Sequence, residues 1–258
     1  MMESQRPLIL VANDDGITAP GIRALVKVMN TLGDVIVVAP DGPQSGMGHA
    51  ITIEGILRCD KVTISKGPQQ EYSCSGTPVD CVKLAMNQIV PRKPDLIVSG
   101  INHGSNSSIN VLYSGTMSAA VEGALEGIPS VGFSMLDYSW DADFSAAEPY
   151  IKRIAQEVLA KGLPDGVCLN VNIPKVSEEP YKGIKVCRQA RANWVEEFDA
   201  RKDPRERSYY WLTGRFENFD RGQDTDEWAL ENNYLSMVPI SIDMTSHDQL
   251  SNLNGWKL

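Results

Sequence analysis

Continuous apolar runs alternate with helical patterns along the first two thirds of the chain. Residues 7–12 form a continuous apolar run, and residues 33–40 repeat the pattern after one acid, Asp34, as is typical of strands that are covered on both faces. Between them, apolar side chains recur roughly at helical spacing, at Ile22, Leu25, Val26, Val28 and Met29. The pattern therefore predicts a βαβ unit, whose right-handed crossover makes the two strands parallel and places their carboxyl ends at one edge of a sheet.

The same alternation continues to about residue 174. Residues 94–101, 130–135 and 166–174 predict further strands, and residues 145–162 predict a helix. Another helix is expected to begin near Ser114, where small residues allow close packing. Together these elements predict an α/β fold with a mostly parallel sheet.

Two shorter segments have local patterns of their own. Alternating Ile51, Ile53 and Ile56 suggest a short strand or hairpin. Thr77 is suited to cap a helix, and Asp80 follows three residues later, as in a capping box. The second segment therefore predicts a helix that begins directly after Thr77.

Beyond residue 183 the sequence becomes β-rich. Residues 185–190, 209–216 and 232–243 are short strand-like pieces, and charged loops such as residues 196–207 separate them. The charged run at residues 201–207 is typical of a solvated loop rather than a binding patch. We therefore expect an extended β-rich arm.

Composition restricts the possible partners and the compartment. The chain of 258 residues suffices for one large α/β domain with an appendage. Its net charge of −9 argues against binding a nucleic-acid polymer or an anionic membrane. The five cysteines are widely spaced and form no CxxC pair, so we expect reduced, mostly buried thiols. The first ten residues carry no targeting pattern, and no long apolar run is present, which indicates the cytoplasm.

Two adjacent carboxylates follow the first predicted strand, in the sequence Asn13-Asp14-Asp15-Gly16. Adjacent acids repel each other unless a positive charge lies between them. Hard cations such as Mg²⁺ and Mn²⁺ prefer oxygen ligands, and α/β sheets bind ligands at the carboxyl ends of their strands. The alternative is structural: Asp14 would form an Asx turn, and Asp15 would cap the helix ahead of Pro20.

Two further polar loops follow predicted strands at the same edge. Residues 41–48 combine Ser45 with several glycines, which suits an ion but also an ordinary turn. The loop after residues 94–101 carries Asn102 and Asn106. The helix that follows it begins with Ser114-Gly115-Thr116, and a helix amino terminus with small residues can hold a phosphate. Helix capping by Ser114 or Thr116 is compatible with that role.

Several phosphate-handling classes do not fit these loops. Haloacid-dehalogenase phosphatases use an Asp-x-Asp pair, whereas the residue two positions before Asp15 is Asn13. The sequence has no GxGxxG after the first strand and no GxxxxGK[ST]. The three histidines, His49, His103 and His247, are too scattered to suggest a triad or a zinc site.

At these loops the sequence resembles the SurE family of metal-dependent 5′/3′-nucleotidases. The matching motifs, in order and at family-like intervals, are ILVANDDGITAPGI, VVAPDGPQSGMGHAIT, SGTPVDCVKLA, PDLIVSGINHGSN and YSGTMSAAVEGALEGIPSVGFS. VNIP and DMTSHDQL extend the likeness nearly to the end of the chain. The resemblance implies a single domain over residues 1–258, with a three-layer, Rossmann-like core. It also implies that residues 191–233, approximately, form an arm that exchanges between subunits of a homodimer or homotetramer.

The resemblance also implies roles for individual residues. Asp14, Asp15, Ser45 and Asn102 would ligate one divalent cation, Mg²⁺ or Mn²⁺, in each subunit, and the two aspartates would be the catalytic pair. Asn106 and the Ser114-Gly115-Thr116 turn would surround the substrate phosphate. His103 occupies a variable position of the family motif, and a histidine beside a metal ligand is able to donate a proton to the leaving alkoxide.

The expected reaction is hydrolysis of nucleoside 5′- and 3′-monophosphates to nucleoside and phosphate by a metal-activated water, with short polyphosphate as a further substrate. Attack by Asp14 or Asp15, giving an aspartyl phosphate, is the mechanistic alternative. A regulator that binds nucleotide or polyphosphate without turnover is the functional alternative. The two carboxylates favour the enzyme, because they would weaken phosphate binding unless a metal is bound.

Overall fold

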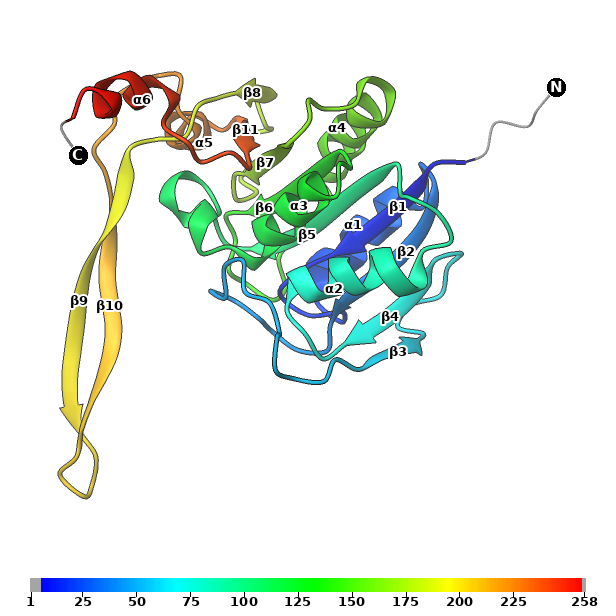
Figure 1. Cartoon of the computed structure of the whole chain (residues 1–258), viewed down its shortest axis with the longest axis horizontal. Coiled ribbons are helices and arrows are strands. Elements are labelled where there is room, and N and C mark those ends of the chain that lie inside the picture. Colours follow the sequence, from blue (N-terminus) through cyan, green and yellow to red (C-terminus); the bar gives the residue numbers. More distant parts are fainter. Residues whose placement is uncertain (1–5, 257–258) are drawn as a thin grey trace.

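The computed structural model describes residues 6–256, and its main feature is a nine-stranded sheet (Figure 1). Residues 1–5, which begin the stretch considered for a targeting segment, and residues 257–258 lie outside the described part. The spatial order of the strands is β3-β4-β2-β1-β5-β6-β7-β11-β8. Their bounds are β1 Leu8–Ala12, β2 Asp34–Pro40, β3 Cys59–Val62, β4 Gln70–Cys74, β5 Leu96–His103, β6 Ser130–Met135, β7 Val167–Ile173, β8 Ile184–Val186 and β11 Leu235–Ser241.

Helices cover both faces of this sheet. The apolar stripes of α1 and α4 pack on one face, and α2 and α3 pack on the other. The predicted α/β fold with three layers is therefore confirmed. The helices are α1 Pro20–Met29, α2 Pro78–Leu84, α3 Gly115–Leu125, α4 Glu148–Lys161, α5 Asp226–Glu231 and α6 His247–Asn254, with single turns η1 Ala85–Ile89 and η2 Ser108–Leu112.

The strand order creates a crevice between β1 and β5. From β1 the chain proceeds outward through β2 and β4, and then returns to place β5 on the opposite side of β1. The two strands are parallel, so their carboxyl ends lie side by side at one edge of the sheet. The loops that follow them run in opposite directions. Such a switch point is where open α/β sheets bind their ligands.

Of the predictions for the two shorter segments, one holds and one is wrong. Thr77 caps α2 in a reciprocal capping box with Asp80, as predicted. The alternating isoleucines Ile51, Ile53 and Ile56 do not form a strand, because all three side chains are exposed in an irregular segment and the next strand, β3, begins only at residue 59. Alternation alone does not make a strand when no neighbouring strand pairs with it.

A long two-stranded hairpin extends away from the body of the molecule (Figure 1). Its strands are β9 Ala192–Lys202 and β10 Ser208–Asn218, which pair antiparallel along their whole length. The expectation of a charged loop at residues 196–207 is therefore wrong for residues 196–202, which belong to β9. Both faces of that strand are solvated, so it shows no hydrophobic alternation, and its pairing with β10 supplies the stabilising hydrogen bonds.

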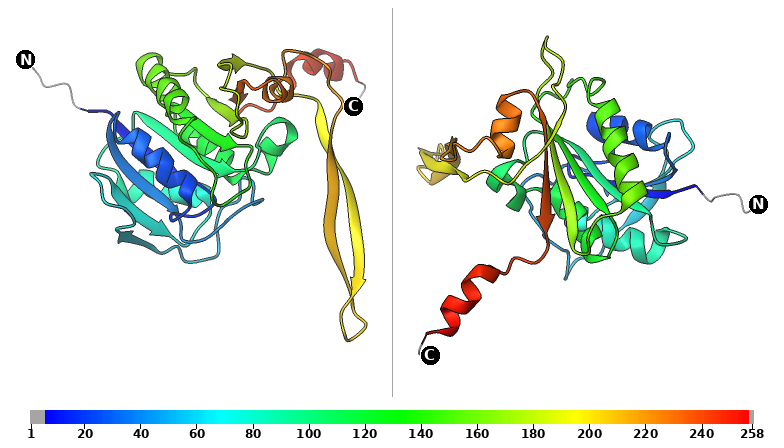
Figure 2. Two further views of the ribbon diagram at one scale, coloured as in Figure 1. Left: turned by 180° about the vertical axis from the view of Figure 1, so that it is seen from behind. Right: turned by 90° about the horizontal axis from the view of Figure 1, so that it is seen from above.

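The segments around the hairpin return to the body, except for the last helix. The hairpin itself spans residues 192–218, and α5, further along the expected arm of residues 191–233, packs against β11. By contrast, α6 has no buried residue and projects from the body (Figure 2). Among residues 6–256 no helix has the length and apolar character needed to cross a bilayer.

Candidate active site

Asp14, Asp15 and Asn102 meet at the switch point between β1 and β5. Asp14 and Asp15 follow β1 directly, and Asn102 lies at the end of β5. The backbone N–H of His103 donates a hydrogen bond to Asp15 Oδ2 at 3.1 Å, which joins the two strand ends. The structure thus places the predicted acids and the predicted amide at the carboxyl ends of two adjacent strands.

The loop of Ser45 closes over the same point. The backbone N–H of Gln44 donates to the carbonyl oxygen of Asp14 at 2.7 Å, so the loop is fixed to the residue that it faces. A cavity of about 240 Å³ opens here, and its lining includes Asp14, Ser45 and Asn102. Three of the four predicted metal ligands therefore share one cavity, and Asp15 adjoins them through the chain.

Asp14 is buried at the base of this site, with only 3% of its surface exposed. The Thr116 hydroxyl donates to its Oδ1 atom, and the start of α3 packs against it closely. A Cβ atom on Gly115 would lie 2.7 Å from Asp14 Cβ and 2.9 Å from Oδ2, so only glycine fits at that position. Burial, and then the charge of Asp15, raise the pKa of the Asp14 carboxyl group to about 6.

The surroundings of Asp15 also disfavour a negative charge on its carboxyl group. Burial raises the pKa of its carboxyl group, and the His103 backbone hydrogen bond opposes this effect. Neither aspartate forms an ion pair with a lysine or arginine within residues 6–256. The structural alternative also fails for Asp15, because α1 is preceded by Ala19 as its N-cap and has no side-chain cap.

The available donors suit a hard divalent cation. Asp14 and Asp15 contribute carboxylates, Ser45 a hydroxyl group and Asn102 an amide oxygen, whose partner nitrogen is already used in a 2.9 Å hydrogen bond to the Gly104 carbonyl. No group of three or more His, Cys, Asp or Glu residues in the described chain could hold a metal. An all-oxygen set of two acids with neutral donors fits Mg²⁺ or Mn²⁺ rather than Zn²⁺.

The predicted phosphate-binding residues divide into two groups. Ser114 and Asn106 line the cavity. Ser114 is also the N-cap of α3, since its hydroxyl accepts the Met117 N–H at 3.0 Å. Gly115 and Thr116 lie against Asp14, where the Thr116 hydroxyl is already committed. The helix amino terminus is thus beside the acids, with Ser114 at its open side.

Two asparagines that were not predicted hold Asn106 in place. Asn172 Oδ1 accepts the Asn106 N–H at 2.8 Å, and Asn170 Nδ2 donates to the Asn106 carbonyl at 2.7 Å. Both lie on β7, where they interrupt the otherwise apolar run CLNVNI. Amides at alternate positions of a buried strand are the pattern that could have identified them, because buried polar groups need partners.

Asp226 joins this loop to the base of the hairpin. Its carboxylate accepts backbone N–H groups from Ser108 and Ala190, each at 2.8 Å, and it is 1% exposed. Its neighbour Glu227 accepts a hydrogen bond from the Ser107 hydroxyl. Asp226 and Ser108 lie 118 residues apart in sequence, so no local pattern predicts their contact.

His103 is held by an aromatic loop that follows β6. Its Nδ1 atom lies 2.9 Å from the Ser139 carbonyl oxygen, which fixes a tautomer with the proton on Nδ1. The imidazole ring stacks on Trp140 at 5.7 Å between centroids and meets the edge of Phe144 at 5.3 Å. Its Nε2 atom is buried and has no hydrogen-bond partner within residues 6–256. It is therefore free to form a hydrogen bond with a ligand.

A buried carboxylate anchors the far end of the Ser45 loop. Glu122 on α3 is 2% exposed and lies 3.0 Å from His49 Nε2 and 2.6 Å from Lys83 Nζ. Burial opposes ionisation of Glu122, but its hydrogen bonds to these two partners lower its pKa overall. The loop is therefore fixed at both ends, by the Asp14 backbone and by Glu122.

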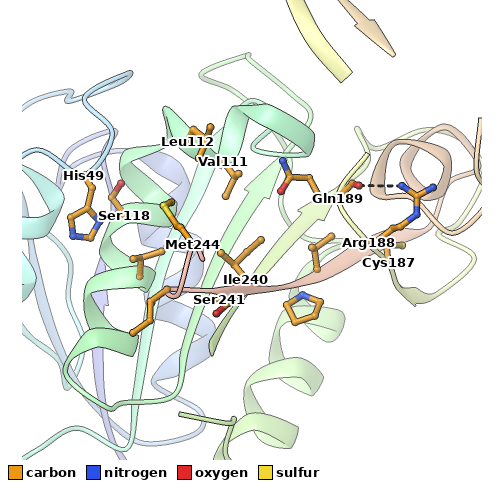
Figure 3. Close-up of a pocket in the computed structure, with 14 residues that line it drawn as sticks. His49, Val111, Leu112, Ser118, Cys187, Arg188, Gln189, Ile240, Ser241 and Met244 are labelled. Atoms are coloured by element: carbon orange, nitrogen blue, oxygen red, sulfur yellow. Dashed lines mark hydrogen bonds between the residues drawn. The ribbon is translucent and has the colours of Figure 1, made fainter. Parts of the chain in front are cut away.

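A second cavity, of about 510 Å³, lies apart from the acids (Figure 3). Figure 3 shows Val111, Ile240 and Met244 facing it, and most of its lining is apolar. It contains His49 and Arg188 but none of the predicted ligands. Its composition suits an apolar contact rather than phosphate chemistry.

Comparisons with known proteins agree on one family. The family model described as Survival protein SurE matches residues 9–196. The protein named 5′-nucleotidase SurE of Flavobacterium psychrophilum is 65% identical over 253 residues, which cover 98% of each chain. A protein of the same name from Christiangramia forsetii is 65% identical over 258 residues, covering 100% of this chain and 99% of the relative. The crystal structure of the SurE protein from Aquifex aeolicus has a TM-score of 0.83 at 37% identity and covers 96% of this chain and 98% of that one.

Proposed function

Because the chain belongs to the survival protein SurE family, we propose that it is a 5′-nucleotidase that hydrolyses nucleoside monophosphates with the help of one divalent cation. Relatives named 5′-nucleotidase SurE, at 60–65% identity over nearly the whole chain, support the nucleotidase activity. The metal dependence is supported by the position of four oxygen donors at the β1/β5 crevice, namely Asp14, Asp15, Ser45 and Asn102. Hydrolysis of 3′-monophosphates and of short polyphosphate belongs to the same proposal.

In this proposal Asp14, Asp15, Ser45 and Asn102 hold Mg²⁺ or Mn²⁺. When bound, such a cation lowers the pKa of the attacking water and neutralises charge on the phosphate oxygens. Thr116 orients Asp14 through its hydroxyl group, and the His103 backbone orients Asp15, so both carboxylates are positioned before substrate arrives. Direct attack by an aspartate on phosphorus is the alternative route.

The phosphate is expected to lie between the acids and the start of α3. Asn106 and Ser114 face the cavity and supply hydrogen-bond donors to phosphate oxygens, while Gly115 and Thr116 contribute the amino terminus of the helix. The Nε2 atom of His103 is the candidate proton donor to the leaving alkoxide once the imidazole is protonated.

The test is phosphate release from nucleoside 5′- and 3′-monophosphates and from tripolyphosphate, first in chelator and then with added Mg²⁺ or Mn²⁺. We expect release only with metal, and none from the variant Asp15→Asn. The matched control is Asp165→Asn, because Asp165 is an exposed acid in a loop before β7. If folded wild-type protein binds metal but releases no phosphate from any substrate, the non-catalytic phosphate-binding regulator replaces the enzyme.

We also propose that the subunits assemble through the hairpin and α6. The hairpin exposes large apolar side chains that its own chain does not cover, at Phe198, Tyr210, Trp211 and Leu212. Leu250, Leu253 and Trp256 are exposed likewise in and after α6. A homodimer or homotetramer in which these segments pack on a neighbour, with the apolar cavity of Figure 3 as a receiving surface, would bury them.

The cytoplasm is the proposed location. All five cysteines are free thiols, and four of them are buried. Unpaired cysteines in this number are typical of a reducing compartment. The proposal is tested by fractionating the source cells and following the protein with an antibody, where recovery outside the cytoplasmic fraction would contradict it.

A further inference from the structure

Three aromatic side chains from separate segments line the active-site cavity. Tyr113 lies just before α3, Tyr138 follows β6, and Trp194 lies at the base of the hairpin. We propose that they form a nucleobase subsite, in which the base of the substrate stacks beside the bound phosphate and purines are preferred. This proposal rests on the nucleotidase function and specifies its substrate class.

These aromatic rings are unusually exposed for the wall of a cavity. The exposed fractions are 53% for Tyr113, 76% for Tyr138 and 40% for Trp194. The same cavity of about 240 Å³ is also lined by Asp14. A ligand with a phosphate at one end and a flat apolar ring at the other would satisfy both.

Trp194 is held in a fixed orientation. Its indole N–H donates to Asn110 Oδ1 at 2.7 Å, and its ring meets the edge of Phe216 across the hairpin at 5.7 Å between centroids. The hydrogen bond reaches from the hairpin to η2, so the indole is tied to the wall of the site. A preorganised ring loses little freedom when a base stacks on it.

Tyr138 lies directly over the backbone of the site. A Cβ atom on Gly104 would lie 2.5 Å from Tyr138 Cε1, and Gly104 has φ +119°, so the ring and the backbone geometry both require glycine there. Gly104 lies two residues from Asn102 and from Asn106. The phenol ring therefore lies against the same loop that carries the predicted metal ligand Asn102 and the predicted phosphate ligand Asn106, and all three line the cavity.

The charge of the lining also favours a base. Within the described residues the cavity is lined by no lysine or arginine, and its titratable side chains are Asp14, His103 and the two tyrosines. A second or third phosphate would meet no lysine or arginine in this lining. A neutral flat ring matches that surface, and the fused rings of a purine present more stacking area than a pyrimidine.

The kinetic test compares adenosine 5′-monophosphate with ribose 5-phosphate, which lacks the base. We expect Trp194→Ala and Tyr138→Ala to raise KM for the nucleotide about tenfold, with little change in kcat and none in KM for ribose 5-phosphate. Uridine 5′-monophosphate should show a smaller rise than adenosine 5′-monophosphate. Equal changes for both substrates, or no change for either, would overturn the subsite.

The control is Trp211→Ala, an exposed tryptophan further along the same hairpin, with the oligomeric mass of every variant measured by light scattering. A second readout needs no turnover: adenosine, added in chelator, should quench tryptophan fluorescence in wild type and in Trp211→Ala but not in Trp194→Ala. Equal quenching in all three proteins contradicts the proposal. If wild type hydrolyses neither substrate but the quenching pattern holds, the nucleotidase function fails and the base subsite stands.

Discussion

Replacing Asp14 with asparagine is expected to stabilise the metal-free protein at neutral pH, even though it removes a proposed metal ligand. The carboxylate is buried beside Asp15, and within residues 6–256 it has no basic partner. Asparagine has nearly the same shape, and its Oδ1 atom is able to keep the hydrogen bond from the Thr116 hydroxyl. The substitution therefore removes mainly a charge.

The magnitude follows from the pKa of Asp14, which rises from 3.8 to about 6 on folding. A shift of this size corresponds to about 3 kcal/mol of preference for the neutral carboxyl group. Because the folded state binds the proton more tightly than the unfolded state does, the penalty grows as the pH rises from about 4 and is fully present above about 6. At pH 4 the folded carboxyl group is neutral and the unfolded one is about half ionised, so only about 0.5 kcal/mol of the penalty remains.

The assay is urea unfolding in chelator at pH 7 and at pH 4, at one protein concentration because the protein is proposed to be oligomeric. The unfolding free energy of Asp14→Asn should exceed that of wild type by up to about 3 kcal/mol at pH 7, and by only about 0.5 kcal/mol at pH 4. Asp165→Asn, an exposed acid, should match wild type at both values. Added Mg²⁺ at about 100 times its Kd should stabilise wild type by about 2.7 kcal/mol and leave Asp14→Asn unchanged.

The reasoning is refuted if metal-free Asp14→Asn is no more stable than wild type at pH 7, or if its advantage is as large at pH 4. Either result would mean that the buried carboxylate is compensated inside the protein. The site would then not require a cation on electrostatic grounds.

Three further outcomes are expected. Asp226→Asn should lower both the thermal midpoint and the rate of phosphate release, because asparagine cannot accept all the backbone N–H groups that join the phosphate loop to the hairpin; unchanged melting and kinetics would contradict that bracing role. Glu122→Gln should destabilise the protein by about 1–2 kcal/mol in urea at pH 7, since its two basic partners are partly exposed. Because the pKa of Glu122 is lowered on folding, this difference should disappear as the pH falls below the ordinary value of 4.5, and its persistence there would point to packing instead. Replacing residues 196–214 by an Asn-Gly turn between Val195 and Arg215 should give a folded chain of smaller oligomeric mass by light scattering, whereas the parent mass would refute assembly through the hairpin.

The sequence by itself determined the elements that depend on local pattern. The apolar runs predicted strands that the structure places at Leu8–Ala12 and Ser130–Met135, and the Thr77 capping box predicted the start of α2. Asp14 and Asp15 were identified because two acids directly follow a buried strand, whereas Ser45 and Asn102 were assigned through the resemblance to the SurE family. These features depend on a few consecutive residues, so they can be recognised without knowing which strands pair.

Only the tertiary structure decided which segments meet. Strand order brought β5 beside β1, which placed Asn102 next to the acids although nearly ninety positions separate them in sequence. Tertiary contacts also brought Trp194 from the hairpin to the active-site cavity and joined Asp226 of α5 to Ser108. Pairing with β10 made residues 196–202 a strand. Pairing and packing are contacts between distant segments, and a local pattern of side chains carries no information about the partner that it will meet.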